Sequence, residues 1–125
     1  MRLVQVAQRA TDLDRATRWY ADLLGADPVA TYDPPGIVFF DVGGVRLMLG
    51  RGESSSVAYL EVEDIVGTVE RLRAAGTTVT SEPHVIFLHD DGTLGPAGHD
   101  EWQAFVEDPD GNTVGLVEHR PTAAD

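Results

Sequence analysis

The same order of elements occurs twice in this chain: a strand, a helix that ends in a glycine, and then further strands. In the first half the strand is LVQVA and the helix is TDLDRATRWYADLLG. In the second half they are VAYLEV and DIVGTVERLRAAG. Asp12 aligns with Asp64, 52 residues further on, and Gly44 aligns with Gly111, 67 residues further on. The chain is therefore interpreted as two copies of one βαβββ module, each needing another layer to cover its sheet.

Turn residues mark the remaining strands of both modules. After the first helix, the runs PVATY, GIVFFDV and VRLML are separated by Pro34-Pro35-Gly36 and by the hairpin pair Gly43-Gly44. After the second helix we expect four runs: TTVTS, HVIFLH, EWQAFVE and NTVGLVE. Thr11 and Asp64 are expected to cap the helices. These boundaries predict one domain over residues 1–125, with module 1 at 1–50, a linker at 51–56, module 2 at 57–119 and a tail at 120–125.

Charge and composition argue against several classes of function. Twenty-one Asp and Glu residues against nine Lys and Arg give a net charge of −12, which repels nucleic acid and anionic membrane surfaces. The absence of cysteine removes disulfides, thiolate ligands and thiol nucleophiles. No apolar run approaches the ~18 residues of a membrane span, and no signal-peptide core follows Met1, so a cytoplasmic location is expected. The acidic surface either attracts cationic ligands or serves solubility alone.

Three segments resemble a known family. They are DLDRATRWYADLLG, YLEVEDIVGTVERLRAAG and AFVEDPDGN, in this order. Over nearly its whole length the chain resembles the vicinal oxygen chelate superfamily, which includes glyoxalases, bleomycin-resistance proteins and extradiol dioxygenases. The resemblance implies an α+β fold in which two βαβββ modules form a half-open barrel. It also implies a homodimer that completes a cavity for a small-molecule ligand, and one divalent metal held by four ligands.

The four metal-ligand positions of that family fall on residues that suit a metal poorly. By the family's spacing and the internal repeat, they are Gln5, Met48, Val57 and Gly115. Hard divalent cations prefer oxygen ligands, and zinc or nickel binds imidazole or carboxylate. Val57 and Gly115 offer no side-chain ligand, whereas Met48 offers a thioether and Gln5 a neutral amide. We therefore expect no metal at the family position and no cofactor.

Strand alternation from these four positions predicts which side chains line the cavity. Arg46 and Tyr59 join the same face, giving a mostly apolar surface with a few polar groups, as a small organic ligand requires. Gln5 either binds ligand or satisfies backbone groups, and Met48 fills space. Trp102 either stacks on a ligand at the cavity mouth or anchors a subunit interface. The predicted ligand-binding residues are Gln5, Arg46, Met48, Val57, Tyr59, Trp102 and Gly115.

Histidines and carboxylates in the second module are the candidates for catalysis. His84 and Glu101 form a candidate acid–base pair or a pair of replacement metal ligands, although His84 also suits a backbone-bonded position at a strand entry. Alternation separates the faces of His84 and His89, so both serve one site only if a bulge lies between them. Further acidic and histidine side chains bracket the loop DGTLGPAG, which either binds a cation, forms a lid or is a solvated hairpin. These side chains are His89, Asp90, Asp91, His99, Asp100 and Glu101.

Two main hypotheses about function follow, and the sequence does not decide whether the protein is an enzyme. In the first, the protein binds and sequesters a small cationic or aromatic compound, or acts on it, without the family metal. In the second, it is a lyase, isomerase or epimerase of the glyoxalase type with a non-standard site around His84 and Glu101. A third hypothesis, an interaction subunit, requires a cavity filled by the protein's own side chains.

Overall fold

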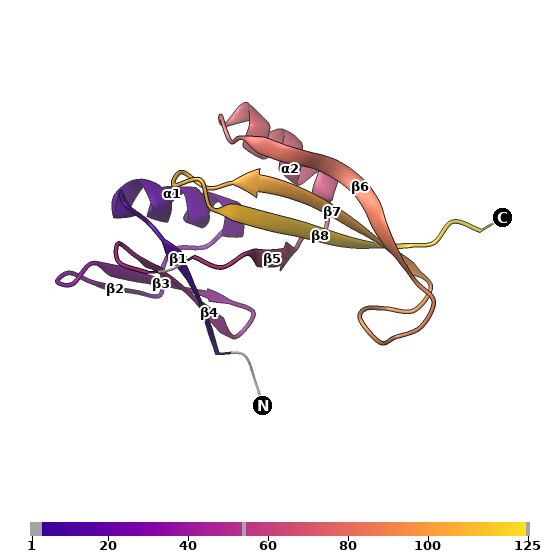
Figure 1. Ribbon diagram of the computed structural model, residues 1–125, viewed down its shortest axis with the longest axis horizontal. Coiled ribbons are helices and arrows are strands. Elements are labelled where there is room, and N and C mark those ends of the chain that lie inside the picture. The colour runs from indigo at the N-terminus through magenta and orange to yellow at the C-terminus, as the bar shows by residue number, and fades with distance from the viewer. Residues whose placement is uncertain (1–3, 54, 125) are drawn as a thin grey trace. The chain divides into compact units, whose positions relative to one another are not determined.

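The computed structural model describes residues 4–53 and 55–124, and the chain divides into two compact units (Figure 1). The first unit comprises the N-terminal half up to Ala58 together with the turn 108–112, and the second comprises the rest of the chain. Each unit is built from strands and one helix, so the α+β class predicted from the sequence is confirmed. The two units are described separately below.

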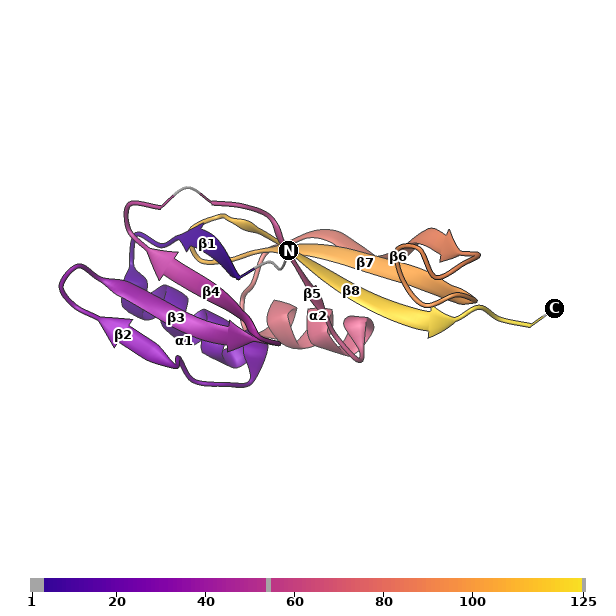
Figure 2. The same ribbon diagram turned by 90° about the horizontal axis from the view of Figure 1, so that it is seen from below.

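The first unit has one four-stranded sheet in the order β1-β4-β3-β2 (Figure 2). Its elements are β1 (Gln5–Arg9), α1 (Leu13–Leu24), β2 (Ala30–Tyr32), β3 (Ile37–Val42) and β4 (Val45–Gly50). β1 runs parallel to β4, and the other neighbours are antiparallel. The helix α1 packs on β3 and β4 and buries Ala16 and Tyr20 against the sheet, whose Phe40 and Leu49 are also buried.

The second unit repeats this topology, with a sheet in the order β5-β8-β7-β6. Its elements are β5 (Ala58–Glu61), α2 (Ile65–Ala74), β6 (Val79–His89), β7 (His99–Glu107) and β8 (Thr113–Pro121). Replacing β1, β4, β3 and β2 by β5, β8, β7 and β6 converts one sheet order into the other. The duplication read from the sequence is therefore a duplication of the fold. β8 reaches Pro121, two residues beyond the end expected for module 2.

Both helices begin at the aspartates that mark the sequence repeat. Asp12 caps α1 and accepts a hydrogen bond from Arg15 N at 3.1 Å, and Asp64 caps α2 in the same way. The prediction of Thr11 as the first cap was wrong. The backbone N–H of Thr11 donates to Asp110 Oδ1 at 2.7 Å, and its hydroxyl donates to the same oxygen. Because the Thr11 hydroxyl is bonded to Asp110, the Asp12 side chain accepts the hydrogen bond from the first turn of α1 instead.

β6 is one strand of 11 residues where the sequence predicted two. Its pairing with β7 shifts register at Val79/Ser81, Ser81/His84 and Val85/Phe87. β6 lies at the edge of the sheet, where a proline without an N–H is tolerated, particularly beside an irregularity. The prediction of two strands was wrong because Pro83 disturbs the register without ending the strand.

The helix α2 covers one face of the second sheet. It packs against β6, β7 and β8, and Glu118 on the covered face accepts a hydrogen bond from Ile65 N at 2.7 Å. Side chains alternate along a strand, so every second residue of β7 and β8 lies on the other face, which we call the face opposite α2. Along three strands this face carries Tyr59, Glu61, Glu101, Gln103, Phe105, Gly115, Val117 and His119.

In the described part of the chain, neither helix is long enough to cross a membrane. α1 has 12 residues and α2 has 10, whereas a spanning helix needs about 20 apolar residues.

Candidate functional site

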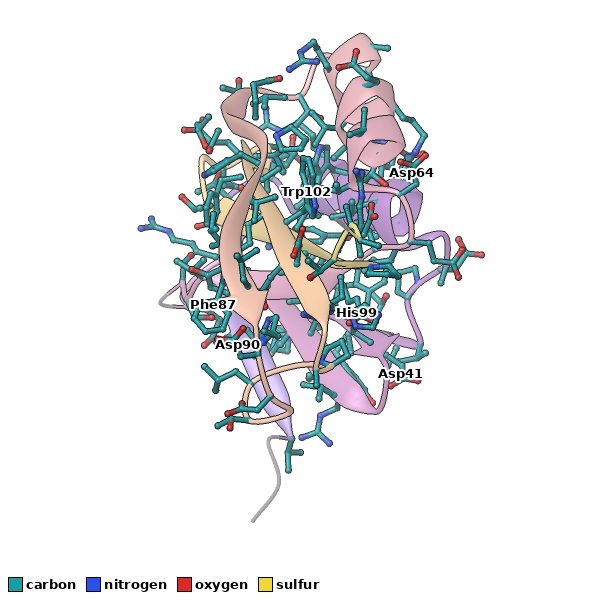
Figure 3. All side chains as sticks on the ribbon, turned by 90° about the vertical axis from the view of Figure 1, so that its right-hand side faces the viewer. Asp41, Asp64, Phe87, Asp90, His99 and Trp102 are labelled. Atoms are coloured by element: carbon teal, nitrogen blue, oxygen red, sulfur yellow. The ribbon has the colours of Figure 1, made fainter. Side chains whose placement is uncertain are left out.

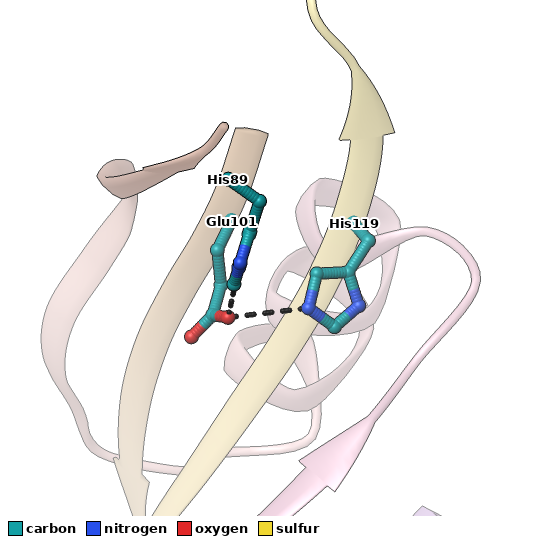
Figure 4. Close-up of side chains that lie close together, drawn as sticks. All are labelled: His89, Glu101 and His119. Carbon is teal, nitrogen blue, oxygen red and sulfur yellow. Dashed lines mark hydrogen bonds and ion pairs between the residues drawn. The ribbon is translucent and has the colours of Figure 1, made fainter. Parts of the chain in front are cut away.

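Three side chains from three adjacent strands meet on the face opposite α2 of the second sheet (Figure 4). Two imidazole nitrogens converge on one oxygen of Glu101: His89 Nε2 lies 2.8 Å from Oε1, and His119 Nε2 lies 3.2 Å from it. The ligand atoms of the three residues lie within 4.8 Å of one another. The side chain of His89 is 1% exposed and those of Glu101 and His119 are 17% exposed. We call these residues the His-Glu-His cluster.

Strand register explains why these residues meet although up to 30 positions separate them. Glu101 and His119 are direct partners in the β7–β8 ladder, and His89 pairs with His99 at the end of the β6–β7 ladder. Directly opposed residues have β-carbons about 4.5–5.5 Å apart. Because strands hold all three side chains, the cluster is built on the regular part of the sheet rather than on the loop 90–98.

Hydrogen bonds fix the orientation of the cluster from outside. Gln103 Nε2 donates to Glu101 Oε2 at 2.6 Å, which leaves Oε1 for the two histidines. Glu61 Oε2 lies 3.2 Å from Nδ1 of His119. Burial would raise the pKa of the Glu101 carboxyl, but the hydrogen bonds from His89, Gln103 and His119 together lower it. Glu101 is therefore an ionised carboxylate at neutral pH.

The loop 90–98 and a pocket both border the cluster. Gly95 lies close to both imidazoles, since a β-carbon at this position would be 2.8 Å from His89 Cε1 and 3.2 Å from His119 Nε2. A pocket of about 560 Å³ begins at His119. Its lining is acidic and polar: Glu61, Val62, Glu63, Pro96, His99, Glu118 and His119. A small ligand in this pocket would reach the cluster through His119.

Of the two predicted catalytic residues, the structure puts Glu101 in the cluster and His84 outside it. His84 is exposed, lies opposite Gln103 in the ladder, and its Nδ1 hydrogen-bonds the carbonyl of Glu82 at 2.8 Å. The register shift between Val85 and Phe87 supplies the bulge that brings His84 and His89 to the same face. The histidines that bond Glu101 are nevertheless His89 and His119.

Sequence reasoning missed His119. The last strand was expected to end at Glu118, and β8 continues past it. The available signal was the period of two, because His119 follows Gly115 and Val117 on one face.

Two family ligand positions of the first unit, Gln5 and Met48, are bonded to each other. Gln5 Nε2 donates to Met48 Sδ at 3.6 Å, and Gln5 Oε1 accepts from Arg46 Nε at 3.0 Å. Met48 is 9% exposed, and Arg46 is exposed. The amide that replaces a ligand is thus held by neighbours from β4.

In the second unit, an aromatic ring fills the space beside Gly115. A β-carbon at Gly115 would lie 2.7 Å from Tyr59 Cδ2 and 3.2 Å from Phe105 Cε1. Tyr59 itself packs edge-on against Phe105, with the ring centroids 5.8 Å apart. A side chain at position 115 would therefore collide with the Tyr59 ring where that ring lies.

The remaining predicted binding residues differ in their surroundings. Val57 is 50% exposed and precedes β5. Trp102 is half-buried, and the guanidinium of Arg120 lies 4.3 Å from its ring centroid. Trp102, which is labelled in Figure 3, pairs with Glu118 on the face that α2 covers. It therefore does not share the face of Tyr59 and Gly115.

Comparison of the sequence with known protein families identifies the family to which this duplicated fold belongs. The model of the Glyoxalase/Bleomycin resistance protein/Dioxygenase superfamily matches residues 2–116, and the chain belongs to this superfamily. It is 28% identical to the lactoylglutathione lyase of Haemophilus influenzae, in an alignment covering 98% of this chain and 96% of that protein. A probable lactoylglutathione lyase of Synechocystis sp. is also 28% identical, with 94% and 95% covered.

Solved structures show the same fold. The crystal structure of lactoylglutathione lyase from Agrobacterium tumefaciens has a TM-score of 0.68 and 22% identity, covering 94% of this chain and 92% of that chain. The residues at the four family positions, Gln5, Met48, Val57 and Gly115, include neither an imidazole nor a carboxylate, the groups that bind zinc or nickel.

Gly115→Ala tests the packing of Tyr59 and is expected to lower the free energy of unfolding by about 1 kcal/mol. Overpacking costs about 1–3 kcal/mol, and replacing a strand glycine by alanine returns about 0.5–1 kcal/mol. In a Tyr59→Ala background the clash is removed, so the same substitution becomes neutral or stabilising. Urea unfolding of the four proteins of this double-mutant cycle measures the difference. Equal effects in both backgrounds would contradict the contact.

Proposed function

We propose that the protein binds a small organic molecule without a metal at the four family positions. The observation that carries the proposal is the Tyr59 ring beside Gly115, where the family has a metal-binding side chain. At this position, packing of the Tyr59 ring against Gly115 takes the place of a side chain that could coordinate a metal. Tyr59 is 56% exposed, so its ring remains available to a ligand.

The chemistry of the exposed groups defines the class of ligand. An exposed tyrosine ring favours a planar or aromatic compound, because stacked and edge-on ring contacts add about 0.5–1.5 kcal/mol beyond burial. Glu61, on the same face as Tyr59, has a side chain that is 75% exposed, and the chain carries a net charge of −12. These charges attract a cation more strongly than an anion. The proposed ligand is therefore planar and neutral or cationic.

Titration calorimetry with bleomycin, the compound in the superfamily's description, and with other planar cations tests this proposal. For a compound that binds, Tyr59→Ala is expected to weaken the affinity at least 10-fold, through loss of the ring contact. Tyr32→Ala is the matched control, since Tyr32 is 55% exposed but lies on β2. An unchanged affinity in Tyr59→Ala would remove Tyr59 from the site. The proposal includes a cytoplasmic homodimer, and native mass spectrometry measures its subunit number.

A second candidate is chemistry of the lyase or isomerase type, which the ionised Glu101 between two imidazoles favours. The curated relatives are named for lactoylglutathione, so this compound is the first substrate to assay. Because residue 115 is a glycine and lacks the metal-ligand side chain that the family has there, we expect no turnover of lactoylglutathione. Turnover by the wild type that is lost in Glu101→Gln and kept in His84→Ala would replace the binding proposal with this one.

A further inference from the structure

We propose that His89, Glu101 and His119 form a binding site for one divalent transition-metal ion. The site lies on the face opposite α2 and differs from the four family positions. His119 is four residues beyond Gly115 on the same face of β8, a shift of about 13 Å along the strand. This inference concerns other residues than the proposed function and does not depend on it.

The distances within the cluster suit an ion. Two nitrogens lie 2.8 Å and 3.2 Å from Glu101 Oε1, and all three ligand atoms lie within 4.8 Å of one another. Zinc bonds of 2.0–2.1 Å in a tetrahedral site put neighbouring ligand atoms about 3.3 Å apart. Small rotations of the three side chains therefore make room for an ion between them. Two imidazoles and one carboxylate are a ligand set used for zinc and for ferrous iron.

The groups behind the ligands support the same interpretation. A metal-binding histidine usually offers its second nitrogen to a carboxylate, and here Glu61 Oε2 lies 3.2 Å from Nδ1 of His119. A metal-binding carboxylate is usually hydrogen-bonded as well, and here Gln103 Nε2 donates to Glu101 Oε2 at 2.6 Å. These outer contacts are separate from the convergence of the three ligands. They hold each ligand with the required atom facing its partners.

The loop 90–98 comes close to both histidine nitrogens at Gly95, where no side chain lies against them. A β-carbon at Gly95 would lie 3.0 Å from His89 Nε2 and 3.2 Å from His119 Nε2, the two atoms that would bind the metal. The pocket of about 560 Å³ is lined by His119 and by Pro96, the residue after Gly95. The ion would therefore have three protein ligands and a position open to water or to an oxygen of a small molecule, which is the arrangement of catalytic rather than structural zinc sites.

Calorimetric titration of chelator-treated protein with Zn²⁺ tests the site. The wild type is expected to bind one ion per chain, and His89→Ala and His119→Ala are each expected to lose at least about 100-fold in affinity. His84→Ala is the matched control, because it removes an exposed histidine from the same strand as His89. Wild type that binds no Zn²⁺, or binding that survives in His119→Ala, would overturn the proposal.

Two glycine substitutions test the site without removing a ligand, in case a histidine variant does not fold. Gly95→Ala puts a methyl group against both nitrogens and is expected to weaken Zn²⁺ binding at least 10-fold without removing a ligand. Gly92→Ala meets only the Gly95 carbonyl at 4.0 Å and is expected to bind as the wild type does. Co²⁺ gives a spectroscopic readout, since coordination by imidazole and carboxylate intensifies its visible absorption. Equal Zn²⁺ affinity in Gly95→Ala and Gly92→Ala would also count against the site.

Discussion

Asp108→Ala is expected to destabilise the protein by about 3–5 kcal/mol, because one buried carboxylate in the first unit accepts four hydrogen bonds. Asp108 is 5% exposed. Its oxygens accept from Asp110 N at 2.9 Å, Asn112 N at 2.8 Å, Asn112 Nδ2 at 2.7 Å and the Tyr20 hydroxyl at 2.9 Å. Removing the carboxylate leaves the buried Tyr20 hydroxyl and three part-buried N–H donors without this partner. Urea unfolding measures the loss.

The control for this variant is the same substitution at an exposed turn of the same unit. Asp41 accepts one hydrogen bond, from Gly44 N at 3.0 Å, and it is exposed in the β3–β4 hairpin (Figure 3). Asp41→Ala is expected to cost about 0.5–1 kcal/mol. If Asp108→Ala costs no more than Asp41→Ala, the proposed role of the buried carboxylate is wrong. Asp108 thus organises a turn, as its sequence context EDPDGN predicts.

The fold was predictable because local signals agree with each other in both halves of the chain. Helical spacing, alternation and turn glycines identify nine of the ten elements of the described residues in the right order. The cap of α2 at Asp64 was also predicted, whereas that of α1 is Asp12 instead of Thr11. The exception, β6, shows the limit of local signals. Pro83 breaks the pattern in sequence, but an edge strand absorbs the break through shifts of register that depend on β7.

The residue types at the four family positions can be read from the sequence, whereas the His-Glu-His cluster cannot. Residue identity alone shows that Gly115 has no ligand atom, although the ring of Tyr59 beside it is a tertiary contact. The cluster depends on two hairpin registers at once. A shift of one residue in β6 or β8 would turn His89 or His119 to the other face. The sequence alone supplies the candidate histidines and carboxylates. The pairing of β6, β7 and β8 determines which three of them meet.

The hydrogen bond from the Tyr20 hydroxyl to the buried carboxylate of Asp108 makes the stability of the protein depend on pH. Tyr20 is 1% exposed, and its hydroxyl donates to Asp108 Oδ2 at 2.9 Å. Burial and the neighbouring charge of Asp108 raise the pKa of Tyr20 well above its ordinary value near 10. The folded state therefore keeps the phenolic proton in a pH range where the unfolded chain releases it.

The sign of the effect follows from this difference in bound protons. Above pH 10 the unfolded state binds fewer protons than the folded state, so the free energy of unfolding falls as pH rises, by up to about 1.4 kcal/mol per pH unit. All nine basic side chains of the protein are arginines, so no lysine titrates in this range. The other tyrosines, Tyr32 and Tyr59, are both more than half exposed. The alkaline loss of stability is thus expected to come mainly from Tyr20.

Tyr20→Phe isolates this contribution. At pH 8 the variant is expected to be about 1–2 kcal/mol less stable than the wild type, because Asp108 loses a buried donor. Between pH 10 and 12 the wild type loses about 2–3 kcal/mol through ionisation of Tyr20, and the variant does not share this loss. Urea unfolding at pH 8, 10, 11 and 12 should therefore show the two stabilities converging and then crossing. Parallel curves would mean that the phenol titrates alike in the folded and unfolded states, and that its bond to Asp108 does not retain the proton.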